Sequence, residues 1–337
     1  MRKLFFLLLF AGFAYSGYWW VGATAKETAI DAWLADRRAA GWAADRSDLV
    51  LTGYPNRFDT ILHDLVLADP VSGWSWSAPV FQILALSYKP NHIIAVWPRS
   101  QTIASPRERI VLNAERMRGS VRFAVNTQLA LEQAVIELTD LRADSTDGWS
   151  AALGEGQIAI RKSPPGGAPD FGYDMSLTAD MVTLPAPIRD ELDPAGLFPA
   201  SIASAEARLT PVYDAPWDRK AVEGPPPNLT ALNVGKLGFT WGGMDLLVRG
   251  TLEADAAGYA SGDLNVVAKN WEDMLEVSIN AGWVPRNMFE SLRRGLSIAA
   301  QLTGDSNQLD ATFRFEGRKV WLGPIPVADA PRMTYRQ

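Results

Sequence analysis

The fold of this chain is decided by the stretch from Leu49 to Pro98, which reads LVLTGYPNRFDTILHDLVLADPVSGWSWSAPVFQILALSYKPNHIIAVWP. Between Val80 and Tyr88, successive side chains alternate between two faces, and bulky residues recur at every second position on the face that holds Val80, Leu84, Leu86 and Tyr88. A period of two is the spacing of a half-buried β-strand. The Pro90-Asn91 pair is a turn signal, and His92 to Trp97 is a second β-prone run. The stretch therefore predicts an antiparallel hairpin.

Further strands are predicted on both sides of this hairpin. Arg57 to Ala68 follows a turn at residues 53–56. The clearest later strand is Tyr173 to Thr183, where apolar residues alternate with Asp, Ser and Thr. Such alternation is typical of an antiparallel sheet with one solvated face. We therefore expect a mainly β (β-rich α+β) fold, with a long curved antiparallel sheet, an N-terminal transmembrane helix and a few packing helices.

A Pro-rich segment at residues 214–228 is the best candidate for a linker, since it contains Pro225-Pro226-Pro227. It predicts a first β-section at 49–213 and a second at 229–337. Within the second section, Pro285 is a suitable first helical residue, and apolar residues recur on one helical face up to Thr303. We expect that helix, residues 285–303, to pack on the sheet.

Residues 1–25 form a membrane anchor or a signal sequence. Leu4 to Ala25 carries no charge and would make roughly 33 Å of helix, close to a bilayer core of about 30 Å. Arg2 and Lys3 precede it, so the remainder should lie on the periplasmic side of the inner membrane, after a single N-terminal span. The alternative is secretion to the periplasm after cleavage near Ala25, where Ala-Thr-Ala fits the small-residue pattern.

Residues 26–48 are predicted to be an amphipathic helix that packs beside the membrane. Ile30, Trp33 and Leu34 follow helical spacing, with charged residues around them. Gly41 is a helix-breaking signal near its end.

Composition excludes several classes of function. The net charge is −6, and no basic run is present, so we expect no nucleic-acid partner. The absence of cysteine removes disulfides, zinc–thiolate sites and cysteine nucleophiles. His63 and His92 are the only histidines, and the sequence has no Gly-x-Ser-x-Gly, Walker or dinucleotide motif. We therefore expect no catalytic residues, no metal, no cofactor and no enzymatic activity.

Four segments carry a resemblance to a known family. They are GYPNRFD at 53–59, GWSWSAP at 73–79, ALSYKPNHIIAVWP at 85–98 and LDATFRFEGRKVWLGPIPVADAP at 309–331. They resemble the DUF2125 family of uncharacterised alphaproteobacterial envelope proteins, and distantly the AsmA-like proteins. The resemblance implies a membrane-tethered periplasmic protein and, through AsmA-like architectures, a curved sheet whose inner face holds acyl chains. It implies no reaction.

Thirteen tryptophans suggest an apolar groove, although large core residues explain most of them. The candidate groove or family-motif positions are Tyr54, Phe58, Trp74, Trp76, Leu84, Leu86, Tyr88, Trp97 and Trp241. The leading hypothesis is a non-enzymatic envelope protein that binds phospholipid, or assists outer-membrane assembly and envelope maintenance.

Two alternatives stay open: an inner-membrane-tethered scaffold that binds an envelope protein, and a glycan-binding module. A lipid binder needs a continuous apolar groove on one sheet face. A scaffold would have that face closed by the 285–303 helix. A glycan binder would expose at least two Trp faces beside Asp, Asn or Arg.

Overall fold

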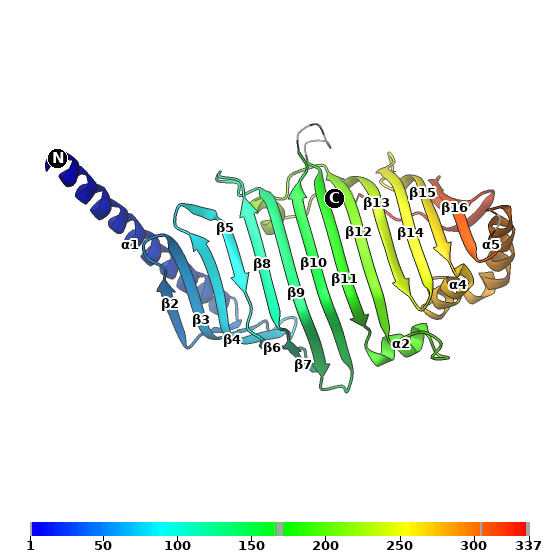
Figure 1. The fold of residues 1–337 in the computed structure, drawn as a ribbon, viewed down its shortest axis with the longest axis horizontal. Helices are drawn as coiled ribbons and strands as arrows, with labels where there is room; N and C mark the ends of the chain where they lie inside the picture. Colours follow the sequence, from blue (N-terminus) through cyan, green and yellow to red (C-terminus); the bar gives the residue numbers. More distant parts are fainter. Residues whose placement is uncertain (1, 165, 167–170, 304, 335–337) are drawn as a thin grey trace. The chain divides into compact units, whose positions relative to one another are not determined.

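The computed structural model describes residues 2–164, 166, 171–303 and 305–334. The sequence prediction of a mainly β fold is confirmed: paired strands run antiparallel, and a long apolar helix stands at the N-terminus (Figure 1). The chain divides into two compact units. Unit 1 comprises Met1–Phe123 and Ile136–Gly148, and unit 2 comprises Ala124–Val135 and Trp149–Gln337.

Unit 1 consists of one helix and a series of antiparallel strands. Strand β3 pairs with β1, β2 and β4, and β4 pairs in turn with β5 and β6. The elements are α1 (Arg2–Ala39), β1 (Ala43–Asp45), β2 (Asp48–Thr52), β3 (Arg57–Ala68), β4 (Ser75–Leu86), β5 (Lys89–Val96), β6 (Ser100–Ala104), β7 (Arg109–Asn113) and β8 (Arg116–Phe123). Strand β9 (Leu131–Ser145) has residues in both units.

Helix α1 differs from the predicted separate helix at 26–48. It runs without a break from the apolar segment to Ala39, and the residues after it enter β1 and β2. The helix ends because Gly41 takes a left-handed conformation, with φ +88°, and its N–H donates to the carbonyl of Arg38 at 2.9 Å. Ala43 then pairs with Ala68 of β3, which stabilises a strand where a helix was expected.

The predicted hairpin is present, but its turn lies earlier. The turn occupies Ser87 and Tyr88, and Pro90 belongs to β5. The register between β4 and β5 shifts at this point, from Leu86↔Lys89 to Ala85↔Ile93. Proline is tolerated at such an irregularity because it has no N–H to donate to the ladder.

The core of unit 1 lies between α1 and one face of β3. The buried residues are Leu34 of α1, Ala44 of β1, and Leu62 and Leu65 of β3. Asp64 has a positive φ of 48°, so Leu62 and Leu65 occupy the same face although they are three residues apart.

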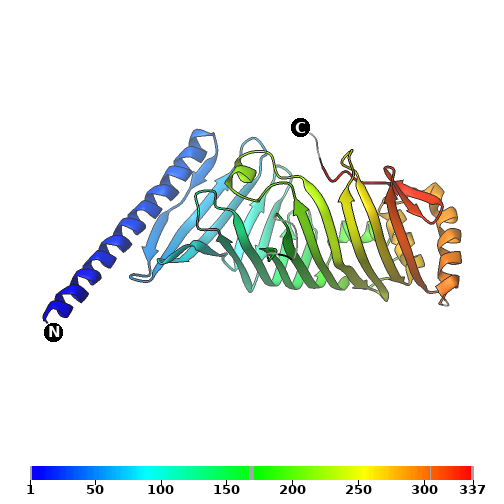
Figure 2. The same ribbon diagram turned by 90° about the horizontal axis from the view of Figure 1, so that it is seen from above.

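In unit 2, each strand from β10 to β18 pairs with the next in chain order (Figure 2). The strands are β10 (Ser150–Lys162), β11 (Tyr173–Thr183), β12 (Ser201–Tyr213), β13 (Leu229–Trp241), β14 (Met244–Ala254), β15 (Ala260–Lys269), β16 (Gln308–Glu316), β17 (Lys319–Leu322) and β18 (Ile325–Asp329). The helices are α2 (Ala186–Leu192), α3 (Arg219–Glu223), α4 (Trp271–Asn280), the 3₁₀ turn η1 (Arg286–Met288) and α5 (Phe289–Thr303).

The Pro-rich segment 214–228 falls inside unit 2 rather than at the division between the units. It connects β12 to β13, which pair along their length from Ser204↔Thr240 to Tyr213↔Leu229. The prolines here belong to a connection between neighbouring strands. This connection contains the short helix α3.

Helices α4 and α5 pack together over β16. Trp271, Leu275 and Ile279 of α4 form a buried cluster with residues of α5 and with Leu309 and Ala311 of β16. The predicted 285–303 helix corresponds to η1 followed by α5. Helix α4 was not predicted, although its three buried residues recur at intervals of four.

Replacing Leu275 by Ala should lower the free energy of unfolding by about 2–5 kcal/mol, because it leaves a cavity in this cluster. The measurement is urea unfolding of the full chain in non-ionic detergent, followed by tryptophan fluorescence. The control is Leu197→Ala, since the Leu197 residue is 73% exposed. A loss no larger than the control's would contradict this packing.

Candidate functional site

The sheet of unit 2 has one apolar face, which follows from its register. Ile158 of β10 lies opposite Leu177 of β11, Leu177 opposite Ala207 of β12, and Ala207 opposite Leu237 of β13. Directly opposed residues in antiparallel strands point to the same side of the sheet. We call the following set the open apolar face: Ile158, Ile160, Met175, Leu177, Ala205, Ala207, Leu209 and Leu237.

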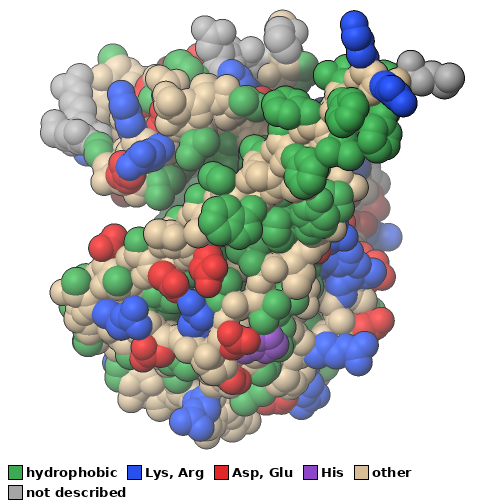
Figure 3. Space-filling model, turned by 90° about the vertical axis from the view of Figure 1, so that its left-hand side faces the viewer, with side chains coloured by type: hydrophobic (Ala, Val, Ile, Leu, Met, Phe, Trp, Pro, Cys, Tyr) green, Lys and Arg blue, Asp and Glu red, His purple; other side chains and the backbone are tan. Residues whose placement is uncertain are grey.

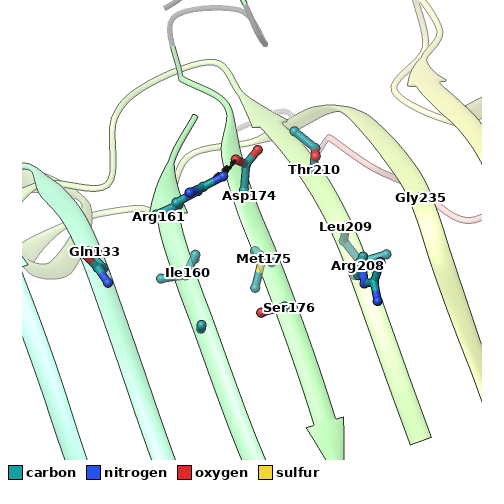
Figure 4. Close-up of a pocket in the computed structure, with 11 residues that line it drawn as sticks. Gln133, Ile160, Arg161, Asp174, Met175, Ser176, Arg208, Leu209, Thr210 and Gly235 are labelled. Atoms are coloured by element: carbon teal, nitrogen blue, oxygen red, sulfur yellow. Dashed lines mark hydrogen bonds and ion pairs between the residues drawn. The ribbon is translucent and has the colours of Figure 1, made fainter. Parts of the chain in front are cut away.

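The opposite face of the same strands is polar. Arg161 forms an ion pair with Asp174 at 3.0 Å (Figure 4). Glu206 bonds Lys236 at 2.5 Å and Arg208 at 2.6 Å, and the hydrogen bond from Lys236 holds the pKa of Glu206 below its usual value. A cavity of about 460 Å³ is lined by Arg161, Asp174 and Arg208 together with Ser176 and Thr210, and its lining also includes Ile160, Met175 and Leu209. Strong pairing makes this the solvated face of the sheet.

The apolar face is closed only in part. Over β14 to β16 it is covered by α4 and α5, which bury Ala268 and Leu309. Over β10 to β13 it stays accessible, since Ile158 is 44% exposed and Leu237 is 43% exposed. The open apolar face can therefore bury an apolar chain that the protein itself does not supply.

Aromatic residues define one end of the open apolar face. Tyr173 is buried, and its hydroxyl accepts a hydrogen bond from the Trp217 backbone N–H at 3.2 Å. The rings of Tyr213 and Trp217 meet edge to face, with centroids 5.5 Å apart. Burial raises the pKa of both Tyr173 and Tyr213.

The other end is defined by Trp241. Its indole N–H donates to the carbonyl of Pro199 at 2.8 Å, and its ring packs against Phe198. The buried carboxylate of Asp193 fixes this loop by accepting hydrogen bonds from the N–H groups of Leu197 and Phe198, at 2.9 and 2.7 Å.

A pocket of about 510 Å³ lies on the same side of the sheet, where Leu232 of β13 opposes Leu252 of β14. We call it the proline-walled pocket. Its lining is mostly apolar and comprises Tyr213, Pro225, Pro226, Pro227, Asn228, Leu229, Leu232, Leu252, Ala260, Pro331, Arg332 and Met333.

The predicted site residues do not form one groove. Phe58 is 6% exposed, because it stacks on Trp19 of α1 at 5.9 Å. Tyr54 lies beside it and bonds Ser16 at 2.7 Å through its hydroxyl. These two residues therefore connect the sheet of unit 1 to the apolar helix, whose exposed side chains form a continuous green surface in Figure 3.

The remaining predicted positions are scattered. Trp76 and Trp97 both contact Phe81, with centroids 5.3 and 5.4 Å from its ring, and the Trp76 indole N–H donates to Gln101 at 2.7 Å. Leu84 and Leu86 point to the other face of β4. The last three are Trp74 and Tyr88, exposed at turns, and Trp241, buried in unit 2.

Sequence reasoning did not assign the open apolar face as a site. The alternation that contains Met175 and Leu177 predicts only a strand with an apolar side. Its continuation through Ile158, Ala207 and Leu237 depends on strand register, which alternation in single strands does not fix.

Taken together, these features define a β-sheet protein with an apolar N-terminal helix and a partly open apolar sheet face. The chain belongs to the DUF2125 family, whose model, described as an uncharacterised protein conserved in bacteria, matches residues 19–331. The resemblance to the DUF2125 family is thus confirmed. No curated protein and no solved structure gave a significant match to the chain.

The raised pKa values of Tyr173 and Tyr213 predict a loss of stability at high pH. Because burial raises the folded-state pKa of Tyr213, the folded chain keeps the phenol proton at a pH where the unfolded chain, with a pKa of about 10, has lost it. The stabilisation is complete below pH 10 and decreases as the pH rises toward the folded-state value.

The measurement is the urea midpoint from pH 8 to 11. We expect Tyr213→Phe to lose less stability across this interval than the parent protein. Tyr88→Phe, at an exposed position, should follow the parent. Identical pH profiles for Tyr213→Phe and the parent would refute the assignment.

Proposed function

We propose that this protein is a non-enzymatic, inner-membrane-anchored envelope protein that binds phospholipid on its periplasmic part and so serves outer-membrane assembly or envelope maintenance. The observation that carries the proposal is the open apolar face, which continues a surface that α4 and α5 cover elsewhere. Apolar surface left in water has an unfavourable free energy of roughly 25 cal/mol per Å². A lipid chain is an occupant that would remove it.

Helix α1 supports the membrane part of the proposal. It is long and apolar enough to cross a bilayer. Arg2 and Lys3 at its start favour a cytoplasmic N-terminus and a periplasmic location for the rest of the chain.

Contacts between α1 and the sheet of unit 1 support retention of the helix. The Tyr18 hydroxyl donates to the carbonyl of Ser87 at 2.6 Å, and the Trp19 indole N–H donates to the carbonyl of Arg57 at 2.7 Å. Gly22 lies against the ring of Phe58, where a Cβ would come within 2.7 Å. Cleavage near Ala25 would remove all three contacts and expose Phe58.

The two alternatives receive less support. A scaffold closed by its own helix would have the whole apolar face covered, whereas α4 and α5 leave the part over β10 to β13 accessible. A glycan platform needs neighbouring exposed tryptophans. Among the described residues the exposed tryptophans are Trp20, Trp33, Trp74 and Trp283, and no two of these rings are in contact.

The lipid proposal predicts that phospholipid co-purifies with the full chain in mild detergent. We expect a stoichiometric lipid by native mass spectrometry, and at least a tenfold loss of it in an Ile158→Glu/Leu237→Glu variant, because charge on the open apolar face opposes an acyl chain. The control is Gln157→Glu/Asn233→Glu, which adds the same charge on the polar face of the same strands. A folded, lipid-free parent protein would favour the scaffold, and equal lipid in both variants would locate the lipid elsewhere.

Retention of α1 predicts that the protein isolated from membranes keeps residues 2–25. The measurement is intact-mass analysis of the membrane fraction. We also expect Gly22→Leu to disturb the packing of Phe58 and lower the melting temperature, whereas Gly12→Leu, where nothing lies within 4 Å, should not. A mature N-terminus at Lys26 would overturn the anchor and leave the secreted alternative.

A further inference from the structure

The proline-walled pocket has the construction of a site for a single apolar chain. Its floor is formed by residues of the apolar sheet face, among them Leu232, Leu252 and Ala260. Two segments of chain complete its walls, 225–228 from the β12–β13 connection and 331–333 near the C-terminus. A volume of about 510 Å³ lies within the usual range for small-molecule sites.

The extent of the pocket matches an acyl chain. It reaches from Tyr213 at the end of β12 to Ala260 at the start of β15, which are three strand spacings apart. At about 4.8 Å per spacing the distance is roughly 14 Å. Half of a bilayer core of about 30 Å has nearly the same length, so a chain from one leaflet would fit.

Positive charge gathers at the β15 end of the pocket. Arg332 lines it, and the guanidinium carbon lies 5.2 Å from the ring centroid of Tyr259. The guanidinium carbon of Arg318 lies 4.9 Å from the same centroid. Among the described residues, neither arginine forms an ion pair; the Arg332 side chain donates only to the carbonyl of Ala257, at 3.4 Å. Two guanidinium groups that contact one ring, neither of them in an ion pair among the described residues, favour an anionic ligand.

The β12 end carries the opposite charge. There, Asp214 accepts hydrogen bonds from both the backbone N–H and the side-chain amide of Asn228, each at 2.8 Å. Asn228 itself lines the pocket. An anionic headgroup would be repelled by this end and attracted by the other, so the charges set the direction in which a ligand lies.

We propose that the proline-walled pocket binds an amphiphile with one long apolar chain and an anionic headgroup, with the headgroup at Arg332 and Arg318 and the chain extending toward Tyr213. This inference deepens the proposed lipid function and rests on it for its biological context. It assigns a distinct pocket and a charge requirement, neither of which the open apolar face imposes.

The test is binding of oleate to the full chain in amphipol, measured by isothermal titration calorimetry, with oleyl alcohol as the uncharged probe of the same chain. We expect Arg332→Gln/Arg318→Gln to weaken oleate binding at least tenfold and to leave oleyl alcohol unchanged. Leu229→Glu, in the pocket wall, should weaken both probes. The charge control is Arg249→Gln/Arg314→Gln, which removes two exposed arginines from the polar face.

Inorganic phosphate distinguishes a headgroup site from a plain anion site. Phosphate at millimolar concentration should not displace oleate, and displacement would overturn the requirement for a chain. Equal oleate affinity in the parent and in Arg332→Gln/Arg318→Gln would overturn the headgroup assignment.

The result is separable from the lipid test on the open apolar face. If phospholipid co-purification depends on Ile158 and Leu237 but oleate affinity is unchanged in Arg332→Gln/Arg318→Gln, the proposed function stands and this inference fails. If oleate binding depends on the two arginines but no phospholipid co-purifies, the assignment of the proline-walled pocket stands and the proposed phospholipid function fails.

Discussion

When apolar and polar side chains alternate along every strand of an antiparallel sheet, one face of the sheet is apolar and is unstable in contact with water. In unit 2 most of the structure follows from the need to cover this face. The strand registers place Ile158, Leu177, Ala207 and Leu237 in one row across four strands, so their apolar surface is continuous. The chain meets the requirement at one end with two helices, α4 and α5. Over the other strands the apolar face is covered only at the strand ends, by aromatic residues and Pro-rich segments.

The polar face shows the contrast. There, carboxylates and cations are paired across neighbouring strands, as in Arg161 with Asp174 and Glu206 with Lys236. Exposed pairs of this kind contribute little to stability, typically between 0 and about 1 kcal/mol. Their effect is to keep this side of the sheet compatible with water. The two faces of the sheet thus differ in polarity, and only the apolar face can bury apolar surface of another molecule.

Much of the fold could be predicted from the sequence, because alternation is a local property. The strand at Arg57–Ala68 has the predicted bounds, and the strand beginning at Tyr173 shows the predicted apolar side. Predictions from local sequence patterns were wrong where pairing between distant residues determines the structure. Residues 43–45 pair with β3 instead of extending a helix, and the proline run at 225–227 connects two paired strands instead of separating domains.

The site was harder to predict for a related reason. The tryptophan pattern points to Trp76, Trp97 and Trp241 as groove residues. Each of them instead packs within its own unit, where Trp76 and Trp241 donate hydrogen bonds and the Trp97 ring contacts Phe81. The open apolar face is made of Ile, Leu, Met and Ala, which carry no individual signal. It becomes a site only when four strands are aligned, and Arg332 and Arg318 become neighbours only through the ring of Tyr259.

Under the proposed anchoring, the hydrogen bonds from Tyr18 and Trp19 to the carbonyls of Ser87 and Arg57 would determine how unit 1 is oriented on a membrane. An anchor joined through a flexible linker lets its domain tumble, whereas a helix bonded side-on to the sheet transmits its own rotation to that domain. Each residue of an α-helix turns by about 100° around its axis. One residue inserted between Leu4 and Tyr15 would therefore rotate unit 1 around the helix axis by more than a quarter turn relative to the apolar side chains that precede the insertion. The length of the helix thus sets the rotational orientation of the sheet relative to the N-terminal part of α1.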